Sequence, residues 1–390
     1  TSGNDLRVLF SSSQSGAGVS VSDTQNISES GEVYCTFTMT ATGTAYLQLG
    51  TGNASHSIDA AMLNISVKEV LTSAQDFDFT RASEATRVLS GGRIEKVRTN
   101  SLLQSNDFDT AWITAAAITR TSGQSGYDGT NDAWKLESNG ASGYDVVYQN
   151  VTMSGVNTYS IYAKAGTNTG FSLRSLSATD ARANFDLSSG SVSTSGTIDA
   201  SIVSVGGGWY RCSITFNGSN NAVYIYPNTL GSASAGFIYI QDAQLEQGLA
   251  ATEYIATTST SVSVGSVNDM PRLDWSGGCS SLKLEPQRTN EFPYSEYFAH
   301  SNWAKENLSV TSNSATSPDG HNNASKLVPD TVLIDHSIYD STPISGSRAF
   351  SVYAKADGYN FIFVGENNNT AADGAFFDLS NGTISQNTSS

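Results

Sequence analysis

The sequence contains few charged residues and no long apolar run, and both shortages narrow the class of protein. Charged residues make up 14% of the 390 residues, and the net charge at pH 7 is −16. Binding to nucleic acid or to an anionic membrane surface needs clustered Lys and Arg, so we expect neither. No apolar run approaches the roughly 20 residues that a membrane-spanning helix needs, so we expect no membrane insertion.

Cysteine is also scarce. The three cysteines, an odd number, provide no disulfide framework. Cys35 and Cys212 lie in strand-like segments, where we expect buried free thiols, whereas Cys279 lies in a Ser-Gly-Gly turn. The sequence begins at Thr1 and shows no signal peptide, which indicates an N-terminus that is processed or cropped from a longer chain.

Recognisable catalytic motifs are missing. The four histidines form no metal-binding motif, and no Gly-x-Ser-x-Gly, P-loop or dinucleotide-binding string is present. We therefore predict that the protein is not an enzyme and requires no cofactor. A polysaccharide-degrading enzyme remains the alternative, because the carboxylate pairs of glycosidases meet only in space.

Short alternating segments dominate what is present. Examples are "TYSIYAKA", "YRCSITF" and "AVYIYP", separated by Gly, Asn and Ser, while amphipathic helical runs are nearly absent. Alternation with period two, interrupted at regular intervals by turn residues, is typical of an all-β sandwich.

A long internal repeat organises the chain. The strings "RTN", "YAKA" and "FDLS" each occur twice, with second copies 190 to 192 residues after the first, and the residue types between them also agree. A nearly constant shift over about a hundred residues indicates a duplicated module. The first copies begin at residues 98, 162 and 185, and the second copies begin at residues 288, 353 and 377.

The repeat predicts five segments. Residues 31–69 match the closing half of the complete module at low identity, with Cys35 placed on Cys212 and Glu69 on Glu246. Each connector centres on Ser-Gly-Gly, which permits a tight hairpin turn. The predicted segments are an end-half of a module (1–75), a hairpin connector (76–97), a complete β-sandwich module (98–255), a second hairpin connector (256–287) and a start-half of a second copy (288–390).

Several strings resemble a known family. "FTRASEATRVLSGGRIEKVRTN", "YSIYAKAG", "GGGWYRCS" and "IYIQDAQLEQGLAATEYI" resemble modular bacteriophage virion proteins, chiefly tail or head fibres, whose modules are similar to galactose-binding, carbohydrate-binding-module-like jelly rolls. The resemblance covers most of residues 31–390. It implies tandem jelly-roll sandwiches in an extracellular virion appendage that attaches to the host surface.

The same resemblance implies the partners of the protein. They are a host cell-surface glycan, other virion proteins and further copies of the chain in a homo-oligomer such as a trimer. A secreted adhesin or a noncatalytic carbohydrate-binding module remains a further alternative, because a fold does not fix a function.

Alternation along two strands predicts candidate ligand contacts. Tyr162 and Lys164 lie on the face opposite Tyr159, Ile161 and Ala163, which we expect in the core. Trp209 and Arg211 lie on the outward face of the strand "WYRCSITF", beside Tyr162 in one arrangement. The competing interpretation is packing on a sheet surface, and we favour it for the Tyr162–Lys164 pair because both copies carry it.

Five further tryptophan and tyrosine positions can be assessed from the repeat. Trp134 is the first candidate for ligand contact, because the second copy has Ser325 there, whereas Trp112 and its counterpart Trp303 indicate core packing. The sequence pattern assigns no face to Tyr224 and Tyr226, and alignment with Leu47 and Leu49 favours the inward one.

Sandwiches of this kind often hold a structural calcium ion near the chain ends, where opening and closing strands are neighbours. Calcium prefers six to eight oxygen ligands. The candidates are Asp107, Asp109 and Asp242, with ordinary surface carboxylates as the competing interpretation.

Overall fold

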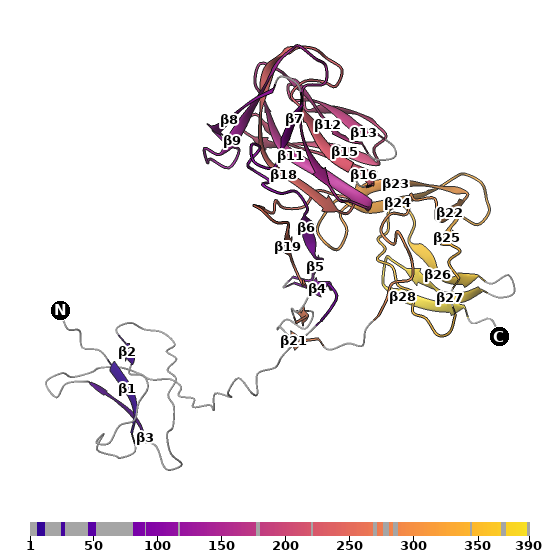
Figure 1. The fold of residues 1–390 in the computed structure, drawn as a ribbon. Helices are drawn as coiled ribbons and strands as arrows, with labels where there is room; N and C mark the ends of the chain where they lie inside the picture. Colours follow the sequence, from indigo (N-terminus) through magenta and orange to yellow (C-terminus); the bar gives the residue numbers. More distant parts are fainter. Residues whose placement is uncertain are drawn as a thin grey trace. The chain divides into compact units, whose positions relative to one another are not determined.

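A computed structural model of the chain describes residues 6–11, 25–27, 46–51 and 81–387, the last range with gaps at 90, 116–117, 177–179, 220, 268–270, 276–280, 284–287, 344 and 368–371. The chain divides into two compact units, Thr1–Asp78 and Phe79–Ser390 (Figure 1). All helix-or-strand elements of the described residues are β-strands, and none is an α-helix. This confirms the all-β prediction.

The first unit contains a three-stranded antiparallel sheet in the order β2-β1-β3. Its strands are β1 (Leu6–Ser11), β2 (Gln25–Ile27) and β3 (Tyr46–Thr51). The strands expected around Cys35 and Glu69 lie outside the described residues.

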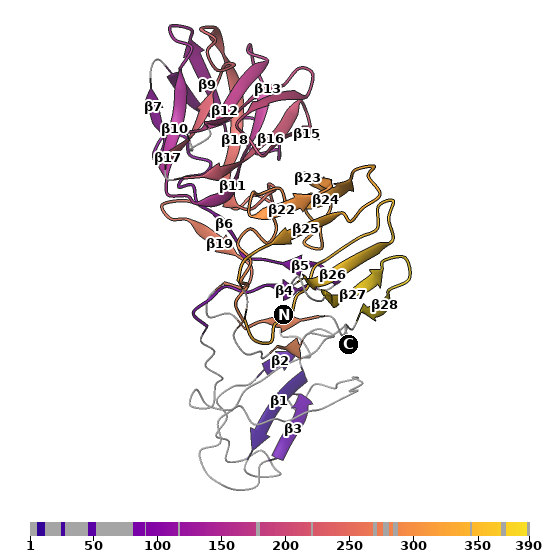
Figure 2. The ribbon, with the colours of Figure 1, turned by 90° about the vertical axis from the view of Figure 1, so that its right-hand side faces the viewer.

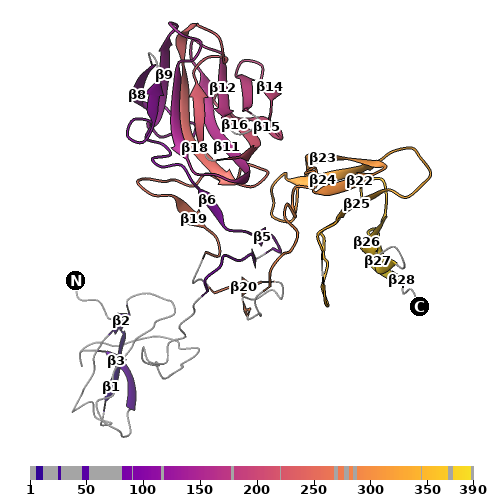
Figure 3. The same cartoon turned by 45° about the vertical axis from the view of Figure 1, so that its right-hand side comes forward.

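The second unit contains a sandwich of two six-stranded antiparallel sheets, here called sheet I and sheet II (Figures 1 and 2). In sheet order, sheet I consists of β14 (Ser191–Ser195), β13 (Ala181–Asp186), β12 (Gly170–Ser175), β17 (Asn221–Tyr226), β10 (Val146–Val151) and β7 (Ile113–Ala115). Sheet II consists of β15 (Asp199–Gly206), β16 (Trp209–Gly218), β11 (Gly155–Ala165), β18 (Ala235–Gln247), β9 (Ala133–Asn139) and β8 (Ile118–Gln124). The strands of sheet II stand side by side in Figure 3.

One apolar core fills the space between the two sheets. As predicted, Tyr159, Ile161 and Ala163 of β11 lie in it, completely buried. Cys212 of β16 is a buried free thiol in the same core, also as predicted, whereas Cys279 lies outside the described residues. Alternate residues of each strand face the core because successive side chains of a strand point to opposite sides.

The connectors form hairpins, but they also pair with each other. The hairpin of β4 (Arg87–Val88) and β5 (Ile94–Glu95) turns at Gly91 and Gly92, whose φ values are 94° and 83°. The strands β20 (Leu273–Asp274) and β21 (Ser281–Leu282) form the second hairpin.

Parallel pairing of β20 with β4 joins both hairpins into one sheet, in the order β21-β20-β4-β5. Strand β6 (Arg98–Asn100) also pairs with β19 (Val262–Val264), which lies within the predicted second connector. The prediction of two separate linking hairpins is therefore incomplete. Pairing satisfies backbone groups along hairpin edges that would otherwise stay open.

The strand pairs after residue 288 repeat those of the sandwich. Tyr339 lies opposite Ala304 as Tyr148 lies opposite Ile113, and Ile362 lies opposite Phe377 as Phe171 lies opposite Phe185. These strands are β22 (Trp303–Glu306), β23 (Leu308–Ala315), β24 (Ala324–Pro329), β25 (Ser337–Asp340), β26 (Phe361–Asn367), β27 (Ala372–Asp378) and β28 (Thr383–Asn387).

The two "YAKA" segments differ in structure. The first lies in β11, which is paired with β16 on one side and β18 on the other. The second, residues 353–356, lies outside any strand. Tyr353 is accordingly 75% exposed, against 9% for its counterpart Tyr162.

Candidate functional site

The structure brings together four of the predicted contact residues on the outer face of sheet II. Tyr162 lies opposite Arg211, and Lys164 lies opposite Trp209, in the β11–β16 ladder. The Arg211 guanidinium lies 5.4 Å from the centre of the Tyr162 ring. This geometry allows a cation–π contact.

A loop covers this group of residues. The ring of Tyr127 stacks on Tyr162 with 3.8 Å between the ring centroids and an interplanar angle of 9°. The Tyr127 hydroxyl donates a hydrogen bond of 2.8 Å to Asp242 Oδ2, which anchors the loop. Trp209 is only 2% exposed. The aromatic residues here pack against one another, so Tyr162 and Trp209 offer no free ring face for stacking.

Trp134 belongs to the core rather than to a ligand groove. Its ring meets Phe108 edge-on at 6.3 Å, and its indole Nε1 donates a hydrogen bond of 2.9 Å to the Asn106 carbonyl oxygen. The side chain is half-buried against the main core. The second copy has Ser325 at the position of Trp134. We attribute this difference between the copies to a difference in packing and not to ligand contact.

The three predicted calcium ligands make separate contacts with the protein. Asp107 accepts a hydrogen bond of 2.6 Å from Thr110 Oγ1, which lowers its pKa. Asp109 Oδ1 lies 2.7 Å from Arg120. Asp242 accepts from Tyr127, and burial raises its pKa to about 6. Within the described part of the chain, no three acidic, His or Cys side chains form a group that could hold a metal ion. These residues therefore do not fit the calcium site.

The structure assigns Tyr224 and Tyr226 the face opposite to the one that alignment with Leu47 and Leu49 favours. Val223 and Ile225 of β17 are fully buried in the core, so the alternating tyrosines point away from it. The low-identity match to Leu47 and Leu49 was the misleading signal. The alternation of Val and Ile with Tyr in "AVYIY" was the correct signal, because it puts the aliphatic side chains in the core and the tyrosines on the outer face of sheet I.

The outward tyrosines form an aromatic strip across two strands of sheet I. Tyr148 of β10 lies opposite Tyr224 of β17, with ring centroids 5.3 Å apart and planes 22° apart. The ring of Tyr226 lies next to that of Tyr224, with centroids 6.3 Å apart and planes 20° apart. Tyr148 and Tyr224 are half-buried, so each exposes part of its ring. Tyr148 and Tyr224 therefore present an apolar surface with phenolic hydroxyls, and Tyr226, which is only 4% exposed, packs beside them.

Polar side chains continue the same face across β12 and β13. Arg174 lies opposite Arg182, and Ser172 lies opposite Asn184. Arg174 Nη1 is 3.4 Å from the Tyr226 hydroxyl, which connects the polar and aromatic parts. Burial raises the pKa of Tyr226, whereas the hydrogen bond with Arg174 opposes that rise. The Tyr226 phenol is therefore neutral at physiological pH and can donate or accept hydrogen bonds.

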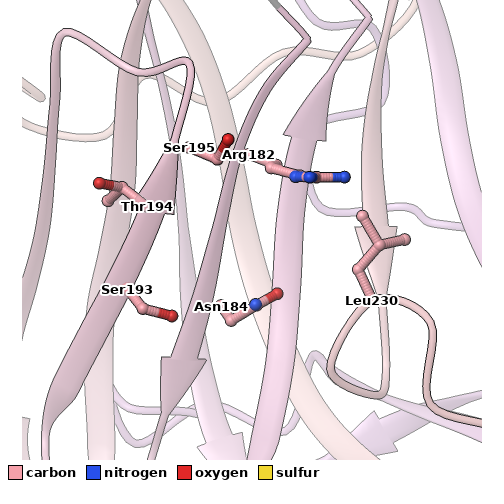
Figure 4. A pocket seen from close by; sticks show the side chains of 6 residues that line it. All are labelled: Arg182, Asn184, Ser193, Thr194, Ser195 and Leu230. Atoms are coloured by element: carbon pink, nitrogen blue, oxygen red, sulfur yellow. The ribbon is translucent and has the colours of Figure 1, made fainter.

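A loop from β17 forms the wall of this face. The Leu230 backbone N–H donates a hydrogen bond of 2.8 Å to Ser172 Oγ, and Ser172 Oγ lies 2.7 Å from Asn184 Oδ1. Beside this wall lies a pocket of about 260 Å³, in which Arg182 and Asn184 extend toward Leu230 (Figure 4). The pocket is lined by Arg182, Asn184, Ser193, Thr194, Ser195 and Leu230.

These residues form the best candidate for a binding site. We call the outward side chains Tyr148, Tyr224, Tyr226, Arg174, Arg182 and Asn184 the tyrosine–arginine face. Aromatic surface beside a few fixed hydrogen-bonding groups is the usual composition of a small-molecule site. The strands hold these groups on a rigid support, and the Leu230 loop closes one side.

Comparison with solved structures finds low-scoring matches to β-sandwich proteins. The CBM22-2 xylan-binding domain from Paenibacillus barcinonensis Xyn10C matches with a TM-score of 0.26 and 13% identity, covering 38% of this chain and 98% of that domain. The enzymatically active domain of bacteriophage CBA120 tailspike protein 4 matches with a TM-score of 0.24 and 17% identity, covering 37% of this chain and 21% of that one.

A third structure, the CBM22-1 and GH10 modules of Clostridium thermocellum Xyn10B with xylohexaose, has a TM-score of 0.24 and 13% identity, covering 38% of this chain and 27% of that one. No family model and no curated protein matches the sequence.

Proposed function

We propose that the complete module binds glycans through the tyrosine–arginine face, in a structural segment of a phage fibre or virion appendage that attaches to the host surface. The observation that carries the glycan part is the strip of Tyr148, Tyr224 and Tyr226, which continues directly into hydrogen-bonding side chains. A sugar ring has apolar faces and a polar rim, so it matches a surface of this composition. The strings that resemble modular bacteriophage virion proteins support the virion part.

Each site on such a fibre binds weakly, and repetition supplies the strength. Linked or oligomeric copies raise the effective concentration of neighbouring sites, so avidity exceeds the affinity of one module. We propose a homo-oligomer that contacts other virion proteins and carries out no catalysis itself. Neighbouring capsid and tail genes in the source genome would support the virion assignment.

The experiment compares two tyrosine variants on a glycan array and by titration with the best glycan. Tyr224→Ala removes the centre of the strip and should weaken binding about two- to tenfold, as expected for a stacked ring worth about 0.5–1.5 kcal/mol. Tyr224→Phe keeps the ring and should lose less. Tyr239→Ala is the matched control, because Tyr239 packs beside Tyr162 and Trp209 on sheet II.

The proposal makes two demands on the result. Wild-type protein must bind at least one glycan, and Tyr224→Ala must bind it more weakly than Tyr239→Ala does at equal folded concentration. Equal losses in both alanine variants, or no binding by the wild type, would contradict the assignment.

A further inference from the structure

Two arginines face each other on the tyrosine–arginine face, although the chain contains only 20 Lys and Arg. Arg174 and Arg182 are directly opposite across the β12–β13 ladder. Like charges in this position destabilise a sheet unless a counter-charge offsets them. A sheet surface that needed only solubility would not require such a pair.

Asp180 neutralises one of the two arginines more closely than the other. Its Oδ1 accepts a hydrogen bond of 2.6 Å from Arg174 Nε. Arg182 Nη1 stays 3.7 Å from Asp180 Oδ2, beyond hydrogen-bonding distance. Two positive charges and one negative charge therefore leave an excess of one positive charge, located at Arg182.

Arg182 lies where a ligand could reach it. Its side chain is 44% exposed, and its guanidinium extends into the pocket together with Asn184 (Figure 4). The ladder places Ser195 opposite Arg182 and Ser193 opposite Asn184, so two hydroxyls flank the charged group. A planar guanidinium beside neutral hydrogen-bonding groups favours a carboxylate.

The second copy shows that the fold does not need this charge pair. Aligning Phe185 with Phe377 places Gly365 and Gly374 at the positions of Arg174 and Arg182. The pair Ser172 and Asn184 likewise becomes Phe363 and Phe376, whose rings contact each other. The arginines therefore belong to the complete module alone, as expected for residues that recognise a ligand.

We infer that the tyrosine–arginine face recognises an acidic glycan, with the carboxylate of one sugar at Arg182 and adjoining sugars on the tyrosine strip. The inference rests on the proposed glycan-binding function and specifies its ligand class. From Tyr148 to Arg182 the face crosses three strand spacings, about 14 Å. That span suits an oligosaccharide whose chain runs across the strands.

The test uses matched pairs of glycans. Oligosaccharides of polygalacturonate, alginate and hyaluronan are each compared with the derivative in which carboxyl groups are chemically reduced to alcohols. We expect wild-type protein to bind at least one acidic member about tenfold more tightly than its reduced form, the difference typical of a charge-assisted hydrogen bond.

Variants of the protein test whether Arg182 causes the preference for acidic over reduced glycans. Arg182→Gln should bind the acidic and reduced members equally, while Arg182→Lys should keep part of the difference. Lys135→Gln is the control for net charge, because Lys135 lies on sheet II and pairs with Glu137. It should retain the full preference.

Three outcomes would overturn the inference in distinguishable ways. If neutral and reduced glycans bind as well as acidic ones, and Tyr224→Ala weakens them all, the glycan function stands and the acidic class is wrong. If an acidic preference survives in Arg182→Gln, Arg182 does not read the carboxylate. If no glycan binds, the proposed function fails together with the inference.

Discussion

Asp242 predicts a pH dependence of stability that one substitution can isolate. It lies in a bulge of sheet II, where the β11–β18 register shifts between Ser160 and Tyr162, and its φ is +55°. Asp242 is 6% exposed, and this burial raises its pKa to about 6. Tyr127 and Tyr254 donate hydrogen bonds that lower the pKa, and the charges of Asp128 and Asp132 raise it further.

The sign and the size of the effect follow from that pKa. Between pH 3.8 and about 6 the folded protein holds a proton that the unfolded chain releases, so the free energy of unfolding falls as the pH rises. The contribution of Asp242 to the free energy of unfolding is fully present below pH 3.8 and is lost as the pH rises through about 6. The difference between 3.8 and about 6 corresponds to at most about 3 kcal/mol.

Asp242→Asn removes the titration and keeps the local structure. Asn tolerates positive φ as Asp does, and its side-chain oxygen can still accept from Tyr127. The variant should match the wild type near pH 4 and exceed it near pH 7.5. A gain of 3 kcal/mol would raise the Tm by about 10 °C, at roughly 2–4 °C for each kcal/mol. Thermal unfolding of both proteins across this pH range measures the difference. A constant difference at every pH would refute the reasoning.

Three further predictions test other parts of the structure. Trp112→Ala should cost about 3–5 kcal/mol in urea unfolding, because Trp112 is 3% exposed and contacts Phe108, and Trp134→Ala should also destabilise but less. An unchanged Tm for Trp134→Ala would contradict its placement against the core. Removing calcium with a chelator should leave the Tm unchanged, since Asp107 and Asp109 have protein partners, and a large decrease would restore the calcium site. Purified protein should release no new reducing ends from capsular polysaccharide above a heat-killed control, and release would support the enzyme alternative.

The local pattern predicted the layers of the sandwich well. Period-two alternation placed Tyr159, Ile161 and Ala163 in the core, because the direction of each side chain follows from strand geometry alone. The repeat correctly paired Trp112 with Trp303 as packing residues. In each case the indole Nε1 donates to a backbone carbonyl, at 3.1 Å to Gln104 and 3.0 Å to Tyr294.

Alternation identified the outward residues without showing what covers them. Tyr162 and Trp209 do lie on the outer side of their strands, yet they are buried there. The cover comes from Tyr127, which is 35 residues before Tyr162 in the chain. No periodicity records such a long-range contact, so the exposure of an outward aromatic residue depends on tertiary structure.

The sequence by itself determined the strand class, the duplication and the inward faces, since these depend on side-chain period and on identity between copies. Tertiary structure decided which outward face stays open and which residues meet on it. Arg174 and Arg182 become neighbours only through the register of β12 with β13, and Tyr148 reaches Tyr224 only through the pairing of β10 with β17. Strand order and register are set by the packing of the whole sandwich, because many non-local contacts must form together to bury one core.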